Sequence, residues 1–338
     1  ENKSITLEQK IFSGFKGLNT FKKSELETKK ANLELKEVEQ KTILSTAFAY
    51  YDLIYKSKNE KFNISNVNLF ERQVESDKAR LQKGEITLTD LAQSESSLAG
   101  ANANLIKAKT ELLSSKTNFE RVTRQNIPKI ENLDEDVNLV LPNTLKQSLE
   151  LSSLNNLSLL IAKLDLEIAN KNLSIERARL SPSASIKVSK TENQDFSSTI
   201  DEQDDETVKA TITWPIIKGG ENISSIKKSS LNKQRAQYLL EDVKNKVNSE
   251  IFKSWSKFQS SKSVLEATKA QLKAAEIANE GITLEYDSGS SRTTLELIQS
   301  RSLLLDARIT SAKAKRDFLV SQFELAKQIG MLSPNSIK

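Results

Sequence analysis

The chain has 338 residues, of which only 9 are Gly and 5 are Pro, so it lacks the backbone breakers that an alternation of short strands and loops requires. The 50 Lys and Arg residues nearly balance the 45 Asp and Glu residues, which gives nucleic-acid binding no compositional support. Without His or Cys, the sequence also lacks the usual proton shuttle, the common zinc ligands and thiol nucleophiles. Long helices are therefore expected, most kinds of enzyme are disfavoured, and no cofactor or metal is expected.

The sequence shows neither a candidate transmembrane helix nor a signal peptide. No apolar run approaches the length of about 18 residues that indicates a transmembrane helix. The sequence opens at Glu1 without the basic and apolar regions of a signal peptide. We expect such a peptide either to have been removed or to lie outside this sequence.

In chain order, the breakers divide the sequence into a few long stretches. A short alternating segment, Ile5 to Ile11, comes first, and it is followed by some 65 residues between Gly17 and Gly84 that are rich in Lys, Glu, Leu, Ala and Asn. As one helix at about 1.5 Å per residue, this stretch would reach roughly 100 Å. The expected division is 1–130 as a first repeat, 131–142 as a linker, 143–181 as a helix leading into a strand, 182–217 as strands with an acidic loop, and 218–338 as a second repeat.

Three segments alternate apolar and polar residues with period two, which predicts strands with one apolar and one wet face. They are Ile5 to Ile11, Ala184 to Val188, and Val208 to Ile216. A small soluble sheet packed on the helices would explain the same alternation. The run from Thr191 to Glu206 holds seven acids and no Lys or Arg, and it is expected to be a solvated loop, since it lacks the fixed spacing and the Gly of a calcium loop.

The sequence contains an internal repeat. At an offset of 205, Gly14 falls on Gly219 and Gly84 falls on Gly289. One extra residue after Gly289 changes the offset to 206. Large residues then recur every seven positions after each turn, with a second series of mostly small residues three positions on, which predicts a coiled-coil seam with closely approaching helices. The first copy of the two series is Leu91, Leu98, Leu105, Leu112, Phe119 and Ser94, Ala101, Ala108, Ser115, Val122, and the second is Leu297, Leu304, Ser311, Phe318, Leu325 and Ser300, Ala307, Ala314, Ser321, Gln328.

This pattern resembles the TolC-type outer-membrane efflux channels. The stretches that carry the resemblance are Ala79–Glu120, Arg177–Pro182 ("RARLSP"), Trp214–Gly220 ("WPIIKGG") and Tyr286–Ala314. The resemblance implies a mainly α fold with a small β part. It implies a homotrimer, in which strands from three protomers close one β-barrel in the outer membrane and the duplicated long helices continue it as a coiled-coil α-barrel through the periplasm.

The resemblance also implies a function and partners. It implies a passive exit duct for efflux or type I secretion, with no chemical step of its own. A periplasmic adaptor (membrane fusion) protein would connect it to an inner-membrane efflux or ABC transporter, and outer-membrane lipid would surround its strands. Members of the family carry one more helix and strand before the first strand, and we expect this N-terminal part to be truncated here. The alternative is a soluble periplasmic coiled-coil adaptor or scaffold.

The family motif assigns a gate to the turns at Gly84 and Gly289. Followed position by position, it makes Thr89 and Asp90 the acidic side of the network that closes the duct, and it makes Tyr286 and Arg292 their partners. Such groups form charge-assisted hydrogen bonds. The alternative is that Asp90 only caps the helix after Gly84 and that Arg292 is a solvated turn residue.

The same motif assigns pore selectivity to Glu296 and Gln299, which match two rings that are acidic in the family. With Gln at the second ring, cation selectivity and metal block should be weaker. The alternative is that Glu296 is an ordinary exposed helix residue. Tyr50 and Trp255 fall at equivalent repeat positions and are expected to be packing anchors between helices.

Overall fold

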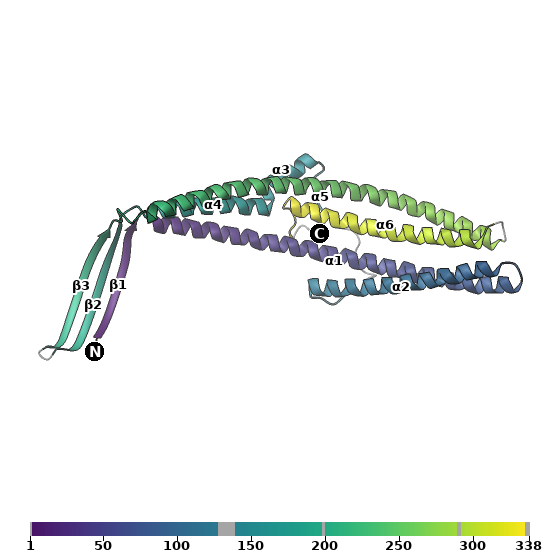
Figure 1. The fold of residues 1–338 in the computed structure, drawn as a ribbon, viewed down its shortest axis with the longest axis horizontal. Coiled ribbons are helices and arrows are strands. Elements are labelled where there is room, and N and C mark those ends of the chain that lie inside the picture. Colours follow the sequence, from purple (N-terminus) through teal and green to yellow (C-terminus); the bar gives the residue numbers. More distant parts are fainter. Residues whose placement is uncertain (1, 128–138, 198–199, 289–291, 335–338) are drawn as a thin grey trace. The chain divides into compact units, whose positions relative to one another are not determined.

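The computed structural model describes residues 2–127, 139–197, 200–288 and 292–334. Its elements confirm the expectation of a mainly α protein with a small β part (Figure 1). The chain divides into two compact units, one formed by Glu1–Glu37 with Leu157–Val247 and the other by Val38–Asn156 with Asn248–Lys338. We refer to them as the sheet unit and the hairpin unit.

The sheet unit contains one antiparallel sheet in the order β1-β2-β3, from the strands β1 (Asn2–Ser13), β2 (Ser183–Ser197) and β3 (Ile200–Thr213). The register places Leu7, Val188 and Val208 side by side. Because neighbouring residues of a strand point to opposite faces, the row of Thr6, Ser189 and Thr207 faces the other way. The period-two pattern predicts these faces correctly except at the end of β1, where an irregularity between Lys10 and Phe12 places Phe12, and not Ile11, opposite Ala184.

The prediction of a solvated acidic loop from Thr191 to Glu206 is wrong for most of that stretch. Strand β2 runs to Ser197 and β3 begins at Ile200, so both strands extend into the acid-rich run. In the ladder, Glu192 lies opposite Asp204, and Lys190 lies opposite Glu206. The backbone ladder continues because these carboxylates are exposed to water and are not desolvated. An ion pair of 2.8 Å between the Lys190 Nζ and the Glu192 Oε1 adds a local contact.

Two helices, not one, occupy the stretch expected as a helix over 143–181. They are α3 (Leu145–Asn155), capped by the Thr144 hydroxyl, and α4 (Leu157–Ala178). Asn156 separates them with an extended backbone, and its side-chain amide donates to the Gln328 carbonyl at 2.9 Å. This side-chain hydrogen bond holds Asn156 outside helical geometry. It explains the break between α3 and α4, which the apolar pattern of the sequence does not reveal. The linker expected over 131–142 lies mostly outside the described residues.

A close approach requires the glycine between β1 and the following helix. Gly14 has a φ of +61°, and a Cβ atom there would come within 2.4 Å of the Ser181 Cβ and 2.8 Å of the Ala178 carbonyl oxygen. Only Gly satisfies both conditions without moving the end of α4. Next to it, Phe15 has a φ of +63°, which is unusual for a bulky residue.

The long helices confirm the internal repeat. Helix α1 (Lys16–Gln82) and helix α5 (Glu221–Asp287) have 67 residues each, and their bounds differ by the offset of 205 that the sequence gives. Helix α2 (Leu88–Thr123) and helix α6 (Thr294–Gln328) begin 206 residues apart. Within the hairpin unit, α2 folds back along the end of α1, and α6 along the end of α5 (Figure 1).

The expected seams form the core of the hairpin unit. Helix α1 packs against α2 through Leu53, Leu112 and Phe119, and it packs against α6 through Tyr51 and Phe323. Most members of both seven-residue series are buried, with Ser94, Leu297, Ser321 and Leu325 fully inaccessible. Small Ser and Ala side chains let the helices approach closely.

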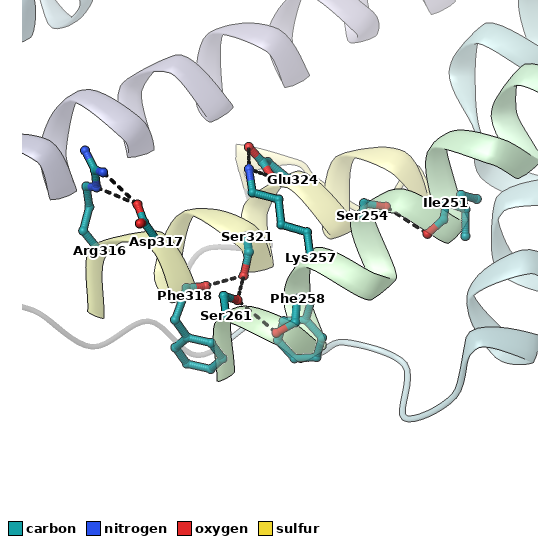
Figure 2. A network of polar contacts seen from close by, with 10 residues as sticks. All are labelled: Ile251, Ser254, Lys257, Phe258, Ser261, Arg316, Asp317, Phe318, Ser321 and Glu324. Atoms are coloured by element: carbon teal, nitrogen blue, oxygen red, sulfur yellow. Dashed lines mark hydrogen bonds and ion pairs between the residues drawn. The ribbon is translucent and has the colours of Figure 1, made fainter. Parts of the chain in front are cut away.

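Helices α5 and α6 are joined by polar contacts together with an aromatic pair (Figure 2). The Ser261 and Ser321 hydroxyls lie 2.8 Å apart, and the Lys257 Nζ lies 2.6 Å from the Glu324 Oε2. The rings of Phe258 and Phe318 stack with centroids 5.9 Å apart. Across the described ranges, no helix combines the length and the apolar character that crossing a lipid bilayer requires.

Candidate functional site

The two turns between the long and the seamed helices begin the candidate site. Helix α1 ends at Gln82, and Gly84 follows in the turn with a φ of +74°, which lets the Gly84 and Glu85 amides donate back to the carbonyls of Leu81 and Arg80. Gly289, the second turn residue that the sequence indicates, lies outside the described residues.

Asp90 and Glu296 hold equivalent positions at the starts of α2 and α6. The Thr87 amide and hydroxyl donate to Asp90 Oδ2 at 3.0 and 2.7 Å, and the Thr293 amide donates to Glu296 Oε2 at 2.9 Å. Each acid therefore closes a capping box. Hydrogen bonds from Thr87, with a smaller contribution from Arg80, hold the pKa of Asp90 below its ordinary value, and bonds from Thr293 lower the pKa of Glu296 in the same way.

The other exposed residues of the motif lie on the same segments. Thr89 is exposed in the first turn of α2, and Gln299 is exposed on α6. The Arg292 guanidinium pairs with Glu285 at 2.6 Å and with Glu296 at 3.2 Å, so both of its partners belong to the α5–α6 hairpin. Within this chain, Asp90 has the capping role that the sequence left as an alternative, whereas Arg292 forms two ion pairs and is not merely a solvated turn residue. The part of both residues in a gate stays a prediction.

Tyr286 is buried, and the acid that it contacts is Asp77. Its hydroxyl lies 3.1 Å from Asp77 Oδ1, to which it donates, and 3.2 Å from the Thr294 hydroxyl. The Arg80 guanidinium lies 4.9 Å from the ring centroid of Tyr286, a cation–π contact. The structure thus joins Tyr286 to a carboxylate of the first repeat, and within the chain that carboxylate is not Asp90.

Asp77 is the centre of a polar cluster that joins helices α1, α2, α5 and α6 in the hairpin unit. Its side chain is fully inaccessible to solvent. Besides the Tyr286 hydroxyl, Gln73 Nε2 donates to Oδ1 at 2.8 Å and the Ser94 hydroxyl donates to Oδ2 at 2.5 Å. We name the Asp77 cluster by its members: Gln73 and Asp77 on α1, Ser94 on α2, Tyr286 on α5, and Thr294 and Arg301 on α6.

Arg301 closes the Asp77 cluster on the side of α6. Its Nη1 donates to Gln73 Oε1 at 3.1 Å, and burial lowers the pKa of its guanidinium, opposed by the nearby acidic groups. A buried carboxylate is tolerated only when its oxygens are hydrogen-bonded, and here three donors satisfy Asp77. Sliding the α5–α6 hairpin past the α1–α2 hairpin would break the Tyr286 bond and leave a buried charge short of a partner.

A second buried contact joins three of these helices. The Arg316 Nη1 on α6 lies 2.6 Å from Asp52 Oδ1 on α1, and the Ser115 hydroxyl on α2 donates to Asp52 Oδ2 at 3.0 Å. The Arg316 guanidinium also lies 5.1 Å from the ring centroid of Tyr55, whose pKa is raised mainly by burial. Tyr50, an expected packing anchor, packs against the core between α1 and its neighbours.

The Asp77 cluster joins the two hairpins through hydrogen bonds between buried side chains. Among the described residues, no group of three or more His, Cys, Asp or Glu side chains is placed to hold a metal ion. The sequence reasoning did not single out Asp77. A signal for it exists, because Val67, Phe70, Val74 and Asp77 follow one another at seam spacing, and the repeat places Ile282 at the position equivalent to Asp77.

Comparisons with known proteins give one consistent result. A family model described as outer membrane efflux protein matches residues 2–123 and 149–331. The chain is 23% identical over 334 residues to the outer membrane efflux protein BepC of Brucella suis biovar 1, covering 98% of this chain and 73% of the relative. It is 24% identical over 322 residues to the outer membrane protein TolC of Vibrio cholerae, covering 93% of this chain and 73% of the relative.

A solved structure is similar over nearly the same extent. The crystal structure of the outer membrane protein VceC from Vibrio cholerae matches with a TM-score of 0.80 at 17% identity, covering 97% of this chain and 79% of that chain. At this identity the likeness concerns the fold.

Proposed function

Because the chain belongs to the outer membrane efflux protein family, we propose that it is the outer-membrane duct of an efflux or secretion system. Three copies would close one β-barrel in the outer membrane and one helical tunnel in the periplasm, and solutes would pass without chemical change. The observation that carries the proposal is a sheet with one apolar face and two unpaired edges, attached to duplicated helical hairpins.

The strands support a place in lipid. They have 12, 15 and 14 residues, whereas a tilted strand needs about 9–11 residues to cross a bilayer. On the apolar face, Leu7, Val208 and Ile212 are all more than two-thirds exposed in the single chain. Edges β1 and β3 cannot stay unpaired in lipid, because each open backbone group there costs several kcal/mol. Strands of neighbouring copies would satisfy both edges.

Exposed aromatic residues mark the junction between the sheet and the helices. Phe12 and Phe15 form an edge-to-face pair with centroids 5.7 Å apart, and the Trp214 indole donates to the Leu180 carbonyl at 3.1 Å. All three rings are exposed. Aromatic girdles of this kind sit where a β-barrel leaves the bilayer, with the ring apolar and its edge hydrated. We assign this level to the periplasmic surface of the membrane.

The helices support assembly. In the sheet unit, three large side chains of α5 are at least half exposed and lie about one or two helical turns apart. They are Leu231, Tyr238 and Leu239. A row of this kind needs a neighbouring helix, and a cyclic trimer supplies one. Members of the family are trimeric channels. For this chain we propose a homotrimer that docks a periplasmic adaptor and, through it, an inner-membrane efflux or ABC transporter.

Along the chain, we propose that 1–130 and 218–338 act as the two helical repeats and that 182–217 belongs to the membrane part. The turns after Gln82 and Asp287 would form the inner end of the duct. Here the Asp77 cluster holds the two hairpins of one protomer together. The exposed side chains of Thr89, Asp90 and Arg292 would face a neighbouring protomer, and Glu296 with Gln299 would line the entrance.

Extraction and channel recording test this function. The protein should leave membranes only with detergent, run as a heat-sensitive trimer, and form ion-conducting pores in a planar bilayer. A soluble adaptor or scaffold would stay in the aqueous fraction and would not conduct. That result would overturn the proposal and favour the alternative.

A further inference from the structure

One face of the sheet carries an excess of unpaired positive charge. The register places Glu8, Lys187 and Lys209 side by side across the three strands, and Lys10 lies one row nearer the helices on the same face. We call Lys10, Lys187 and Lys209 the basic face. Two like charges directly opposite each other destabilise a strand pair, so the Lys187–Lys209 pairing has no structural benefit of its own.

The basic face borders a hollow of about 670 Å³ in the sheet unit. Lys16, Lys218 and Arg179 also line it, whereas its only acidic residues are Glu8 and Glu221, so the lining carries a net charge of +4. Arg179 is paired with Glu176 and Glu221. Within the described ranges, none of the five lysines forms an ion pair, and their charge is left for ions from solution to balance.

The register of the strands also determines whether the basic face meets lipid or water. Lys187 lies between Ile186 and Val188, whose side chains belong to the opposite, apolar face with Leu7 and Val208. In a membrane barrel the apolar face meets lipid and the polar face meets the water-filled interior. The basic face therefore points into the lumen if the proposed assembly forms. The next acid on this face of β3 is Asp205, which lies two rows away, about 13 Å from Lys209 along the strand.

We propose that the basic face makes the membrane end of the duct attract anions, so that negatively charged solutes are the class of cargo that this end favours. This inference rests on the proposed function, because a ring forms only when several copies close the wall. Rings of charged side chains enrich counter-ions in a pore. Three strands from each of three chains give at least nine strands, wider than a barrel that side chains fill, so the lumen holds water.

The width of the lumen determines how strongly added salt weakens the preference for anions. The screening length is about 8 Å at physiological ionic strength and about 30 Å at 0.01 M. The lysines on the wall thus attract anions across the full width of the lumen only at low salt. The preference for anions should be strong in dilute salt and should fade as salt is added.

Reversal potentials across a planar bilayer in a KCl gradient test the inference. The double variant Lys187→Gln with Lys209→Gln should lower the ratio of chloride to potassium permeability by about two- to fivefold in dilute salt, where screening is weakest. Inorganic tripolyphosphate, added from the strand side, should reduce the current of the wild type more than that of the variant. Lys190→Gln is the matched control, because Lys190 lies on the apolar face of the same strand and pairs with Glu192.

The outcomes separate this inference from the proposed function. Channels with the same permeability ratio in the wild type and the double variant would overturn the anion preference alone. A wild-type protein that forms no channel would overturn the proposed function and this inference together. If the double variant does not assemble, Lys10→Gln gives the same measurement with a smaller expected shift, and an unchanged ratio there would also count against it.

Discussion

Removing one hydroxyl from the Asp77 cluster should loosen the inner end of the duct. In Tyr286→Phe the ring stays in place, and the bond from the Tyr286 hydroxyl to Asp77 Oδ1 is lost. Asp77 keeps its donors Gln73 and Ser94, so two of the three hydrogen bonds to its carboxylate remain. Hydrogen bonds to charged groups contribute about 1.5–3 kcal/mol each. That energy corresponds to a change of about 10- to 150-fold in the equilibrium between closed and open hairpins of one protomer.

Single-channel recording measures this equilibrium. Tyr286→Phe should raise the mean conductance of the trimer, and hydrogen exchange at the first turns of α2 and α6 should become faster. Tyr238→Phe is the matched control, since Tyr238 lies on the same helix, is 67% exposed, and its hydroxyl accepts only from Gln234, at 3.3 Å. Equal conductance and exchange in the wild type and Tyr286→Phe would show that the Asp77 bond does not hold the hairpins.

Three further substitutions and one pH series probe the ends of the hairpins and the sheet. Asp90→Ala should remove the N3 half of the capping box, cost about 0.3–1 kcal/mol of helix stability and raise single-channel conductance, and unchanged conductance would restrict Asp90 to a local role. Glu296→Gln should lower the ratio of potassium to chloride permeability in reversal-potential measurements, the opposite direction to the lysine variants, and an unaltered ratio would remove Glu296 from the pore lining. Folding lowers the pKa values of Asp90 and Glu296, so their stabilisation is complete above about pH 5 and is lost as the pH falls through the lowered values. Hydrogen exchange in both first turns should therefore accelerate only in that acidic range, and acceleration near neutral pH would contradict the sign. Gly14→Ala should lower thermal stability, since the new Cβ meets Ser181 and the left-handed backbone is retained, and an unchanged melting temperature would refute the steric argument.

The sequence alone predicts the repetitive part of the fold well. The equal lengths of α1 and α5 follow from the offset between equivalent glycines, and the buried faces of α2 and α6 follow from the seven-residue series. Such features depend on local spacing, which a sequence displays directly. The acid-rich strands were not predictable in this way, because charge suggested solvent exposure correctly but said nothing about the backbone ladder that continues beneath the charges.

The candidate site was predicted only in part, because some of its contacts depend on neighbouring residues and others depend on how distant helices are aligned. Asp90 was singled out by the motif, but its contacts within the chain are those of a helix cap that Thr87 and its own position dictate. The carboxylate beside Tyr286 comes from a position 209 residues earlier. Its identity depends on how two helices of different repeats are aligned in space, and no local pattern specifies that alignment.

The two repeats share their framework and differ where contacts between the hairpins are made. The capping boxes at Thr87 and Thr293 are equivalent, and so are the packed seams. By contrast, Asp77 stands where the second repeat has Ile282, and only the first repeat can receive the Tyr286 hydroxyl on a buried carboxylate. A fully symmetric pair of hairpins would pack through apolar seams that tolerate sliding, whereas a single buried charge with three fixed donors defines one register. The asymmetry thus gives a duplicated structure one preferred register between its two hairpins, which we propose is the closed arrangement of the duct.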